Sequence, residues 1–141
     1  MRLSLFIIPL IIFLDQVSKA KFVHLDSARL ATSCNSGIAF GLFQNARILN
    51  FIVPIVVVSV CFYFLLRQER KIISLALALI VAGGVSNILD RLMMGCVRDF
   101  IDLKFWPSFN LADSAVTIGI LILIFVILVK FEPKYFDDSN H

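Results

Sequence analysis

Two aspartates, Asp99 and Asp113, are the residues of this sequence whose type and spacing are best suited to chemistry. They lie fourteen positions apart in a chain rich in apolar residues, and Asp113 stands near the start of a long apolar stretch. An ionisable residue at membrane depth costs roughly 2.5–3.5 kcal/mol on insertion scales, so it is a candidate functional residue by default. Two acids that can meet near one face of a membrane suggest an acid–base pair.

If Asp99 and Asp113 approach each other, like-charge repulsion and desolvation prevent both from ionising easily. One carboxylate can then deprotonate a water molecule while its protonated partner polarises a scissile carbonyl. This is the chemistry of an aspartic peptidase, which needs no metal and no covalent intermediate, and its apparent pKa values belong to the pair. No Ser-His or Cys-His arrangement competes, because His24 is the only histidine outside the extreme C-terminus.

Four apolar segments must position these acids, and each is predicted to be a membrane-spanning helix. Apolar residues make up 60% of the 141-residue chain and the mean hydropathy is +0.93, whereas average chains are about 45–50% apolar. Segments of about 20 residues cross a hydrocarbon core as helix, in which every backbone group can be paired. We therefore expect an all-α membrane protein with a single domain over residues 1–141. The expected spans are Leu3–Val23, Ile48–Leu66, Ile72–Leu89 and Leu111–Val129.

The basic residues predict how the chain is oriented in the membrane. Three of the five residues from Arg67 to Lys71 are basic, Arg2 precedes the first span, and two lysines follow the last. The positive-inside rule places these segments, and with them both termini, in the cytoplasm. The longer connections His24–Arg47 and Asp90–Asn110 then face outward, and acids partly offset the basic residues that they carry.

With that topology, polar residues of three spans lie at a similar depth. Counting about 1.5 Å per residue from the cytoplasmic end of each span, Asp15 lies about 18 Å up, Asn87 about 22 Å, Lys19 about 24 Å and Asp113 about 25 Å. Spans that run in different directions thus bring their polar groups into the same outer third of the bilayer. This pattern predicts one shared site that faces outward.

Helical spacing places Gly83, Asn87 and Arg91 on one face of the third span. Gly83 would let another backbone or a substrate approach closely. The alternative is that the polar residues of the spans are helix–helix contacts and interfacial anchors. That alternative is weaker for Asp15 and Asp113, because neutral Asn or Ser would serve packing at less cost. It stays open for residues near the water boundary, namely Arg91, Asp102 and Lys104.

The connection from Gly95 to Asn110 is dense in hydrophobic residues, Trp106 among them, which a fully solvated loop would not favour. Aromatic side chains suit the headgroup region of a bilayer. A loop lying on the membrane would bring Asp99 toward Asp113 and could run along a lipid-attached substrate. The alternative is an interfacial anchor without a catalytic role.

The cysteines and histidines do not predict a metal site. Cys34, Cys61 and Cys96 form no CxxC pair and no metal-spaced cluster, and His24 and His141 are far apart. Cys61 lies in an apolar run, where it is expected to pack as a small hydrophobic residue. Cys34 and Cys96 could share one side of the membrane, but the sequence does not show whether they are bridged. No metal and no cofactor is expected.

Five stretches, in order along the chain, match one known pattern. They are Asp15–Lys19 (Asp-Gln-Val-Ser-Lys), Asn35–Phe40 (Asn-Ser-Gly-Ile-Ala-Phe), Gly83–Arg91 (Gly-Gly-Val-Ser-Asn-Ile-Leu-Asp-Arg), Val97–Phe100 (Val-Arg-Asp-Phe) and Phe109–Ser114 (Phe-Asn-Leu-Ala-Asp-Ser). Together they make the sequence resemble the lipoprotein signal peptidase family (signal peptidase II), a set of four-span bacterial membrane aspartic peptidases. The resemblance covers essentially the whole chain.

The resemblance implies that Asp99 and Asp113 are the catalytic dyad. It implies a substrate already modified with diacylglycerol on its lipobox cysteine, a prolipoprotein that is cleaved just before that cysteine. It also implies a protein of the bacterial inner membrane, with a small β-like cradle and a mobile cover on the outer face. Nothing in the sequence demands more than a monomer. Little chain lies between the two aspartates for such a cover. The residues expected to bind substrate or support the dyad are Asp15, Lys19, Asn35, Gly83, Asn87, Arg91, Asn110 and Ala112.

Two other classes of function compete with this interpretation. A small transporter or channel subunit could use Asp15, Asn87 and Asp113 as a proton or ion relay, although such sites usually lie near the bilayer midplane in repeated halves. A non-catalytic membrane scaffold would tolerate Asp99→Asn and Asp113→Asn. A net charge of +3 that is scattered along the chain, with no basic stripe, does not favour nucleic-acid binding.

Overall fold

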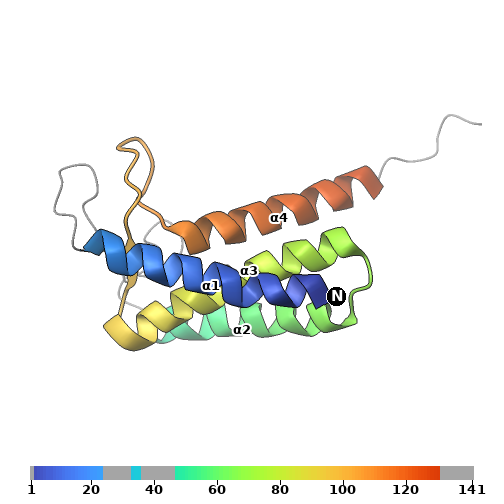
Figure 1. Cartoon of the computed structure of the whole chain (residues 1–141), viewed down its shortest axis with the longest axis horizontal. Helices are drawn as coiled ribbons and strands as arrows, with labels where there is room; N and C mark the ends of the chain where they lie inside the picture. The colour runs from blue at the N-terminus through green and yellow to red at the C-terminus, as the bar shows by residue number, and fades with distance from the viewer. Residues whose placement is uncertain (1, 24–32, 36–46, 131–141) are drawn as a thin grey trace, which may run out of the picture.

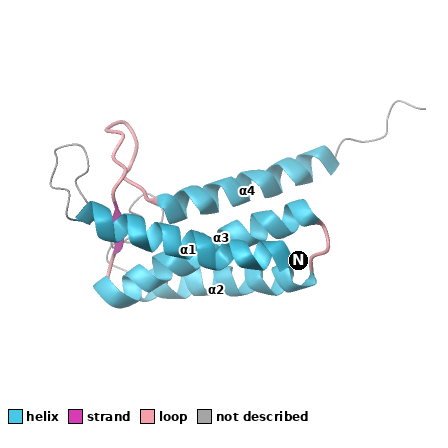
Figure 2. Cartoon of the chain, viewed as in Figure 1, coloured by secondary structure: helices cyan, strands magenta, loops and turns pink. Residues whose placement is uncertain are grey.

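The computed structural model describes residues 2–23, 33–35 and 47–130, and these form four helices and two short strands. The helices lie side by side along the long axis of the molecule, and the strands lie together at one end of it (Figures 1 and 2). The opposite end holds the start of α1, the turn between α2 and α3, and the end of α4. In chain order the elements are α1 (Arg2–Val23), β1 (Ser33–Asn35), α2 (Arg47–Arg67), α3 (Lys71–Met94), β2 (Val97–Asp99) and α4 (Leu111–Lys130).

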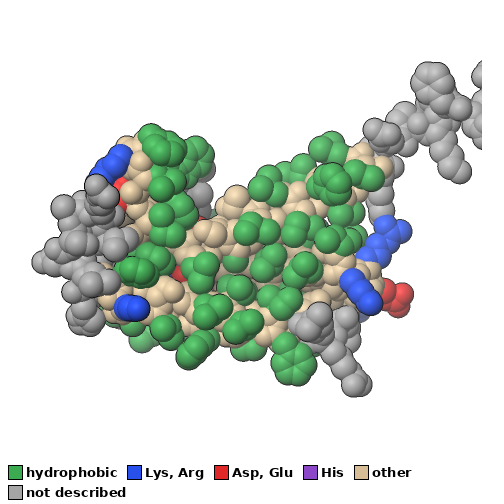
Figure 3. All heavy atoms as spheres, turned by 45° about the horizontal axis from the view of Figure 1, so that its top comes forward, with side chains coloured by type: hydrophobic (Ala, Val, Ile, Leu, Met, Phe, Trp, Pro, Cys, Tyr) green, Lys and Arg blue, Asp and Glu red, His purple; other side chains and the backbone are tan. Residues whose placement is uncertain are grey.

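Three of these helices are long and apolar enough to cross a membrane, by length and composition. They are α2, α3 and α4, over Ile48–Arg67, Lys71–Met94 and Leu111–Val129. Hydrophobic side chains cover the middle of the face shown in Figure 3, and charged side chains lie toward its two ends. α1 is not among the three, and it carries Asp15, Lys19 and Lys21 within its last nine residues. The mostly helical membrane fold thus agrees with expectation, whereas the count of four spans stays a prediction.

α3 is the central helix and packs against α1, α2 and α4. Half of its apolar stretch is buried inside the molecule, against 11% for α2 and 17% for α4. Small residues allow this close packing, as is usual between helices in membranes. A Cβ atom on Gly83 would collide with the carbonyl oxygen of Ala112 and the side chain of Val116, both in α4. Glycine at this position therefore sets how closely α3 approaches the start of α4.

The third helix is longer than the predicted span Ile72–Leu89. It continues to Met94 and ends where Gly95 adopts a left-handed conformation (φ 77°), whose backbone N–H donates to the carbonyl of Arg91. Asp90 and Arg91 are therefore helical residues and not the start of a loop. The apolar run ends at Leu89 because the polar residues Asp90 and Arg91 follow it, although the helix itself continues to Met94.

The two strands form a small antiparallel sheet beyond the helix ends, in which Ser33 pairs with Asp99 and Asn35 with Val97. A disulfide between Cys34 and Cys96 joins the two segments, which answers the question that the sequence left open. The remainder of the Asn35–Phe40 stretch lies outside the described residues, as do both histidines.

After β2 the chain forms a hairpin that returns to the start of α4. The backbone N–H of Ile101 donates to the carbonyl of Phe109 (2.9 Å), and Phe109 donates back to Ile101 (3.1 Å). At the exposed tip, Lys104 Nζ lies 2.8 Å from Asp102 Oδ2. Asp102 and Lys104 thus form a surface ion pair away from the buried polar residues. The hairpin brings the residues that flank it, Asp99 and Asn110, to the same place.

Candidate active site

Asn110 lies between the two aspartates and hydrogen bonds to both. Its side-chain amide donates to Asp99 Oδ1 at 2.7 Å. Its side-chain oxygen accepts from the backbone N–H of Asp113 at 2.9 Å, while Asp113 Oδ2 accepts from the backbone N–H of Asn110 at 3.2 Å. This reciprocal pair is a capping box at the first turn of α4. The same contacts that begin the helix therefore hold the Asp113 carboxylate in place.

Both carboxylate oxygens of Asp99 accept hydrogen bonds from side-chain amides. Asn110 donates to Oδ1, and Asn35 in β1 donates to Oδ2 at 3.2 Å. Asp99 is 1% exposed. Burial, and then the negative charge of Asp113, raise the pKa of Asp99 to about 6, although both amide hydrogen bonds act in the opposite direction. Asp99 can therefore hold a proton near neutral pH.

Asn87 in α3 supports Asp113 from the other side. Its amide donates to Asp113 Oδ1 at 2.8 Å. Its oxygen accepts from Lys19 Nζ at 3.0 Å and from the Asn110 amide at 3.2 Å. Because Lys19 can only donate, it fixes the orientation of the Asn87 amide with the NH₂ group toward Asp113. Lys19 thus acts on the dyad through Asn87.

Asp15 in α1 joins the start of α4 to α3. Its Oδ1 accepts from the backbone N–H of Ala112 at 2.9 Å, and its Oδ2 accepts from the Ser86 hydroxyl at 2.7 Å. Lys19, one helical turn later, forms an ion pair with it at 2.6 Å. A carboxylate at a helix N-terminus pairs an N–H that the helix leaves unpaired. Asp15 therefore positions the α4 turn that carries Asp113.

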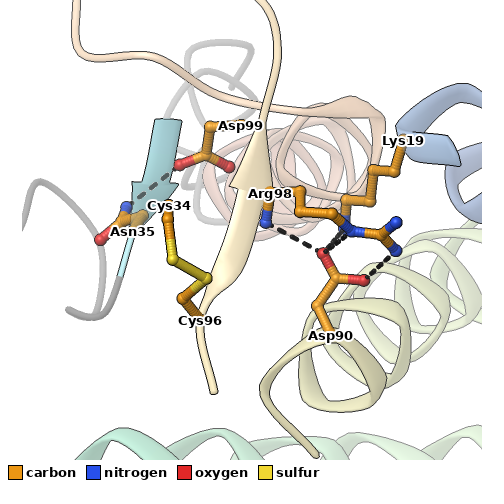
Figure 4. Close-up of a disulfide and its surroundings, with 7 residues drawn as sticks. All are labelled: Lys19, Cys34, Asn35, Asp90, Cys96, Arg98 and Asp99. Atoms are coloured by element: carbon orange, nitrogen blue, oxygen red, sulfur yellow. Dashed lines mark hydrogen bonds and ion pairs between the residues drawn. A yellow bond between two sulfur atoms is a disulfide. The ribbon is translucent and has the colours of Figure 1, made fainter. Parts of the chain in front are cut away.

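A second set of contacts, which the sequence did not predict, ties β2 to the helices. The Arg98 guanidinium donates to Asp90 Oδ1 at 2.8 Å and to the side-chain oxygen of Gln16 at 2.9 Å. Its backbone N–H donates to Asp90 Oδ2 at 2.9 Å, and Lys19 lies 3.3 Å from the same oxygen (Figure 4). Arg98 therefore anchors the strand that carries Asp99 to both α1 and α3.

Gln16 and Ser86 are further residues that the sequence analysis missed. The Gln16 amide donates to the Ser86 hydroxyl at 3.0 Å and to Asp90 Oδ1 at 2.9 Å. Ser86 and Asp90 are one helical turn apart, as are Gln16 and Lys19, so helical spacing was a signal that could have grouped them.

A cavity of about 580 Å³ lies against the two aspartates. Polar residues from β1, β2, α3 and α4 line one part of it, and apolar residues of α4 and of the hairpin line the rest. Arg91, which is 9% exposed, lies in the polar wall. The lining residues are Asn35, Asn87, Arg91, Val97, Asp99, Trp106, Pro107, Ser108, Phe109, Asp113, Ser114, Val116, Thr117, Ile118 and Ile120.

The arrangement can therefore bind an extended, largely apolar molecule and present a polar bond in it to two carboxylates. Within the part of the chain that the structure describes, no three His, Cys, Asp or Glu side chains are grouped as metal ligands would be. The eight predicted supporting residues all lie in or beside this site. Six hold it by side-chain contacts or line it, while Gly83 and Ala112 form the α3–α4 contact beneath it.

The chain is similar to known proteins over most of its length. The model of the family described as signal peptidase (SPase) II matches residues 7–129. The lipoprotein signal peptidase of Caldanaerobacter subterraneus subsp. tengcongensis is 33% identical over 91% of this chain and 97% of the relative. That of Borreliella burgdorferi (strain ZS7) is 39% identical over 92% and 91% of the two chains.

The fold is also similar to that of a solved protein, described as a bacterial membrane enzyme whose structure was determined at 2.3 Å by the in meso method. The TM-score is 0.86 at 26% sequence identity, and the similarity covers 99% of this chain and 96% of the other.

Proposed function

This chain belongs to the signal peptidase II family of aspartic peptidases, and from that premise we propose how it removes signal peptides from prolipoproteins. Asp99 and Asp113 are the catalytic dyad, and the peptide bond cleaved is the one before a diacylglyceryl-modified lipobox cysteine. The observation that carries the proposal is the link through Asn110, whose side chain hydrogen bonds to Asp99 and to the backbone of Asp113 at the wall of one cavity.

The charges around the dyad favour one shared proton. Four acids and three bases, all buried or half-buried, form the polar cluster of this site, so a single proton on the dyad brings the cluster to neutrality. Since Asp99 has a pKa of about 6, the dyad keeps this proton to a higher pH than an ordinary aspartate would. The members of the cluster are Asp15, Lys19, Asp90, Arg91, Arg98, Asp99 and Asp113.

The reaction proceeds by direct attack of water. The ionised carboxylate of the dyad takes a proton from the water as its oxygen bonds to the scissile carbonyl carbon, and the protonated carboxyl donates a hydrogen bond and then its proton to the carbonyl oxygen. The tetrahedral intermediate collapses as the C–N bond breaks: the leaving nitrogen takes a proton from the dyad, and one hydroxyl of the intermediate returns its proton to the dyad as the C=O bond re-forms. The dyad ends with one proton, as it began.

The supporting residues keep both carboxylates in fixed positions. Asn35, Asn87 and Asn110 donate amide hydrogen bonds to the dyad, and Asp15 and Lys19 hold the elements that carry them. Arg91 lies in the cavity wall, where it stabilises negative charge that develops on the substrate carbonyl. Preorganised donors of this kind are usually the largest single contribution to catalysis.

The distribution of basic residues and the disulfide indicate how the chain lies in the membrane. We propose four spans, with α1 as the first, both termini in the cytoplasm and the site near the outer surface. The basic turn between α2 and α3 lies at the end of the molecule opposite the strands (Figure 1), as the positive-inside rule requires. The Cys34–Cys96 disulfide lies at the site end, and disulfides persist on the oxidising side of a membrane.

The apolar part of the cavity suits the substrate class. Residues Val116, Ile118 and Ile120 of α4 continue the cavity from Asp113 along the helix. A signal peptide that spans the bilayer and an acyl chain both present apolar surface at this depth. The enzyme acts as a monomer, with membrane lipid around α2 and α4.

The test is cleavage of a diacylated lipobox peptide by the purified, detergent-solubilised protein. Wild type is compared with Asp99→Asn and Asp113→Asn, each checked by circular dichroism and thermal unfolding, with and without a metal chelator. Loss of about 10²–10⁴-fold in kcat for both folded variants, and no effect of chelator, supports the dyad. Undiminished cleavage by either variant overturns it.

A further inference from the structure

We propose that the disulfide between Cys34 and Cys96 positions the catalytic carboxylate of Asp99, because it holds β1 against β2 and keeps the Asn35 amide on Asp99. Cleavage should then depend on the disulfide being closed. This inference rests on the proposed function, since it concerns the same carboxylate.

The disulfide is close in sequence to both partners of that hydrogen bond. Cys34 directly precedes Asn35 in β1, and Cys96 lies three residues before Asp99 in the segment that forms β2. The Cα atoms of the two cysteines are 5.5 Å apart, and 62 positions of sequence separate them. Figure 4 shows the bond joining the two segments beside the Asn35–Asp99 contact.

Strand pairing alone is a weak means of holding Asn35 in place. Each strand has three residues, and a two-stranded ribbon is marginally stable at best in water. β2 has a second anchor, because Arg98 ties it to Asp90 and Gln16. Two of the side-chain hydrogen bonds of β1 join it to neighbouring segments: Asn35 bonds to Asp99 in β2, and Ser33 bonds to Ser108 in the hairpin at 2.6 Å.

Opening the disulfide would therefore remove the covalent link between two short strands and loosen the Asn35 donor on Asp99 Oδ2. That donor stabilises the ionised carboxylate and lowers its pKa. Its loss raises the pKa of Asp99, so the singly protonated dyad persists to higher pH while its geometry becomes less well defined. Cys34 is exposed, so a soluble dithiol can reach the bond. Two electrons and two protons from the dithiol convert the disulfide to two thiols, and the reagent closes to its own disulfide.

The first measurement counts thiols in the full-length protein. Denatured under alkylating conditions, the unreduced protein should bind one maleimide-polyethylene glycol, at Cys61, which carries a free thiol. After dithiothreitol it should bind three. Three adducts without reductant would show that Cys34 and Cys96 are thiols and would overturn the proposal.

The second measurement compares kinetics of oxidised and reduced wild type, the double variant Cys34→Ser/Cys96→Ser, and Cys61→Ala as the matched control. We expect reduction to lower kcat about tenfold with KM little changed, and to move the basic limb of the pH profile to higher pH. The double variant should show both changes and no response to reductant. Cys61→Ala should behave as wild type, including its response to reductant.

The outcomes separate this inference from the proposed function. Dyad-dependent cleavage that is equally fast, with the same pH profile, after both cysteines are reduced overturns the inference alone. A fall in kcat without a shift of the pH profile, accompanied by a lower melting temperature, would mean a structural role only and also overturns it. No cleavage by oxidised wild type overturns the proposed function and the inference with it.

Discussion

The carboxylate of Asp15 in α1 accepts a hydrogen bond from the backbone N–H of Ala112 at 2.9 Å, across 97 positions of sequence. Asp15 in the first helix thus accepts from a backbone N–H in the first turn of the last helix, at the residue before Asp113. The position of Asp113, one of the two carboxylates proposed as the dyad, therefore depends on a helix that carries neither of them. Several variants can test how far this dependence extends.

Replacing Asp15 should weaken both stability and catalysis. In Asp15→Ala the buried Lys19 ammonium loses its shortest ion pair and Ala112 loses its acceptor. Removing one partner of a buried pair typically costs about 3–5 kcal/mol. Asp15→Asn is the matched variant, because its side-chain oxygen can still accept from Ala112 while the charge is lost. The melting temperature in detergent and kcat should both be highest for wild type, lower for Asp15→Asn and lowest for Asp15→Ala. Equal values for the two variants would contradict the capping role.

The pH dependence follows from the raised pKa of Asp99. The proposed reaction needs one protonated and one ionised carboxylate, and Asp99 loses its proton as the pH rises through about 6. For the free enzyme, kcat/KM should therefore decrease as the pH rises above this value. Substrate that excludes water from the cavity raises the pKa of a buried carboxyl further, so the same limb in kcat should lie at higher pH. A pH–rate profile of both parameters checks this, and a kcat/KM that rises from pH 6 to 8 would contradict it.

Gly83 and Gly84 provide a matched pair for the packing around the dyad. A Cβ on Gly83 collides with the Ala112 carbonyl at the start of α4, whereas one on Gly84 collides with Val58 in α2. Overpacking of either kind costs about 1–3 kcal/mol. We expect Gly83→Ala and Gly84→Ala to lower the melting temperature alike, but only Gly83→Ala to lower kcat strongly, because it moves Asp113 away from Asn87. Equal kcat losses would show that general destabilisation, and not displacement of α4, controls activity.

The sequence predicted that the polar groups of different helices lie together, but it did not predict their individual partners. Counting residues along apolar segments was enough to bring Asp15, Lys19, Asn87 and Asp113 to one end of the bundle, since helical rise is nearly constant. It could not show that Lys19 contacts Asp90 or that Asp15 reaches Ala112, because such contacts depend on how each helix is rotated. Nor could it show the Cys34–Cys96 disulfide, which depends on the register of two three-residue strands.

Arg98 should be needed for its geometry and not for its charge alone. It donates to Asp90 through both its backbone and its guanidinium, and the same guanidinium nitrogen donates to Gln16. Lysine keeps the charge but presents a single ammonium, which cannot reproduce the planar fork. Because β2 carries Asp99, loosening this anchor should displace the dyad while leaving the helices in place.

We therefore expect Arg98→Lys to reduce kcat about tenfold, a loss equivalent to one hydrogen bond between charged groups. The melting temperature should change little, since Lys19 still pairs with Asp90. Lys104→Ala is the matched control, because Lys104 forms an exposed ion pair at the hairpin tip and such pairs contribute little. Kinetics and thermal unfolding of both variants decide the matter: if Arg98→Lys is as active as Lys104→Ala, charge alone suffices and the strand does not require the guanidinium fork.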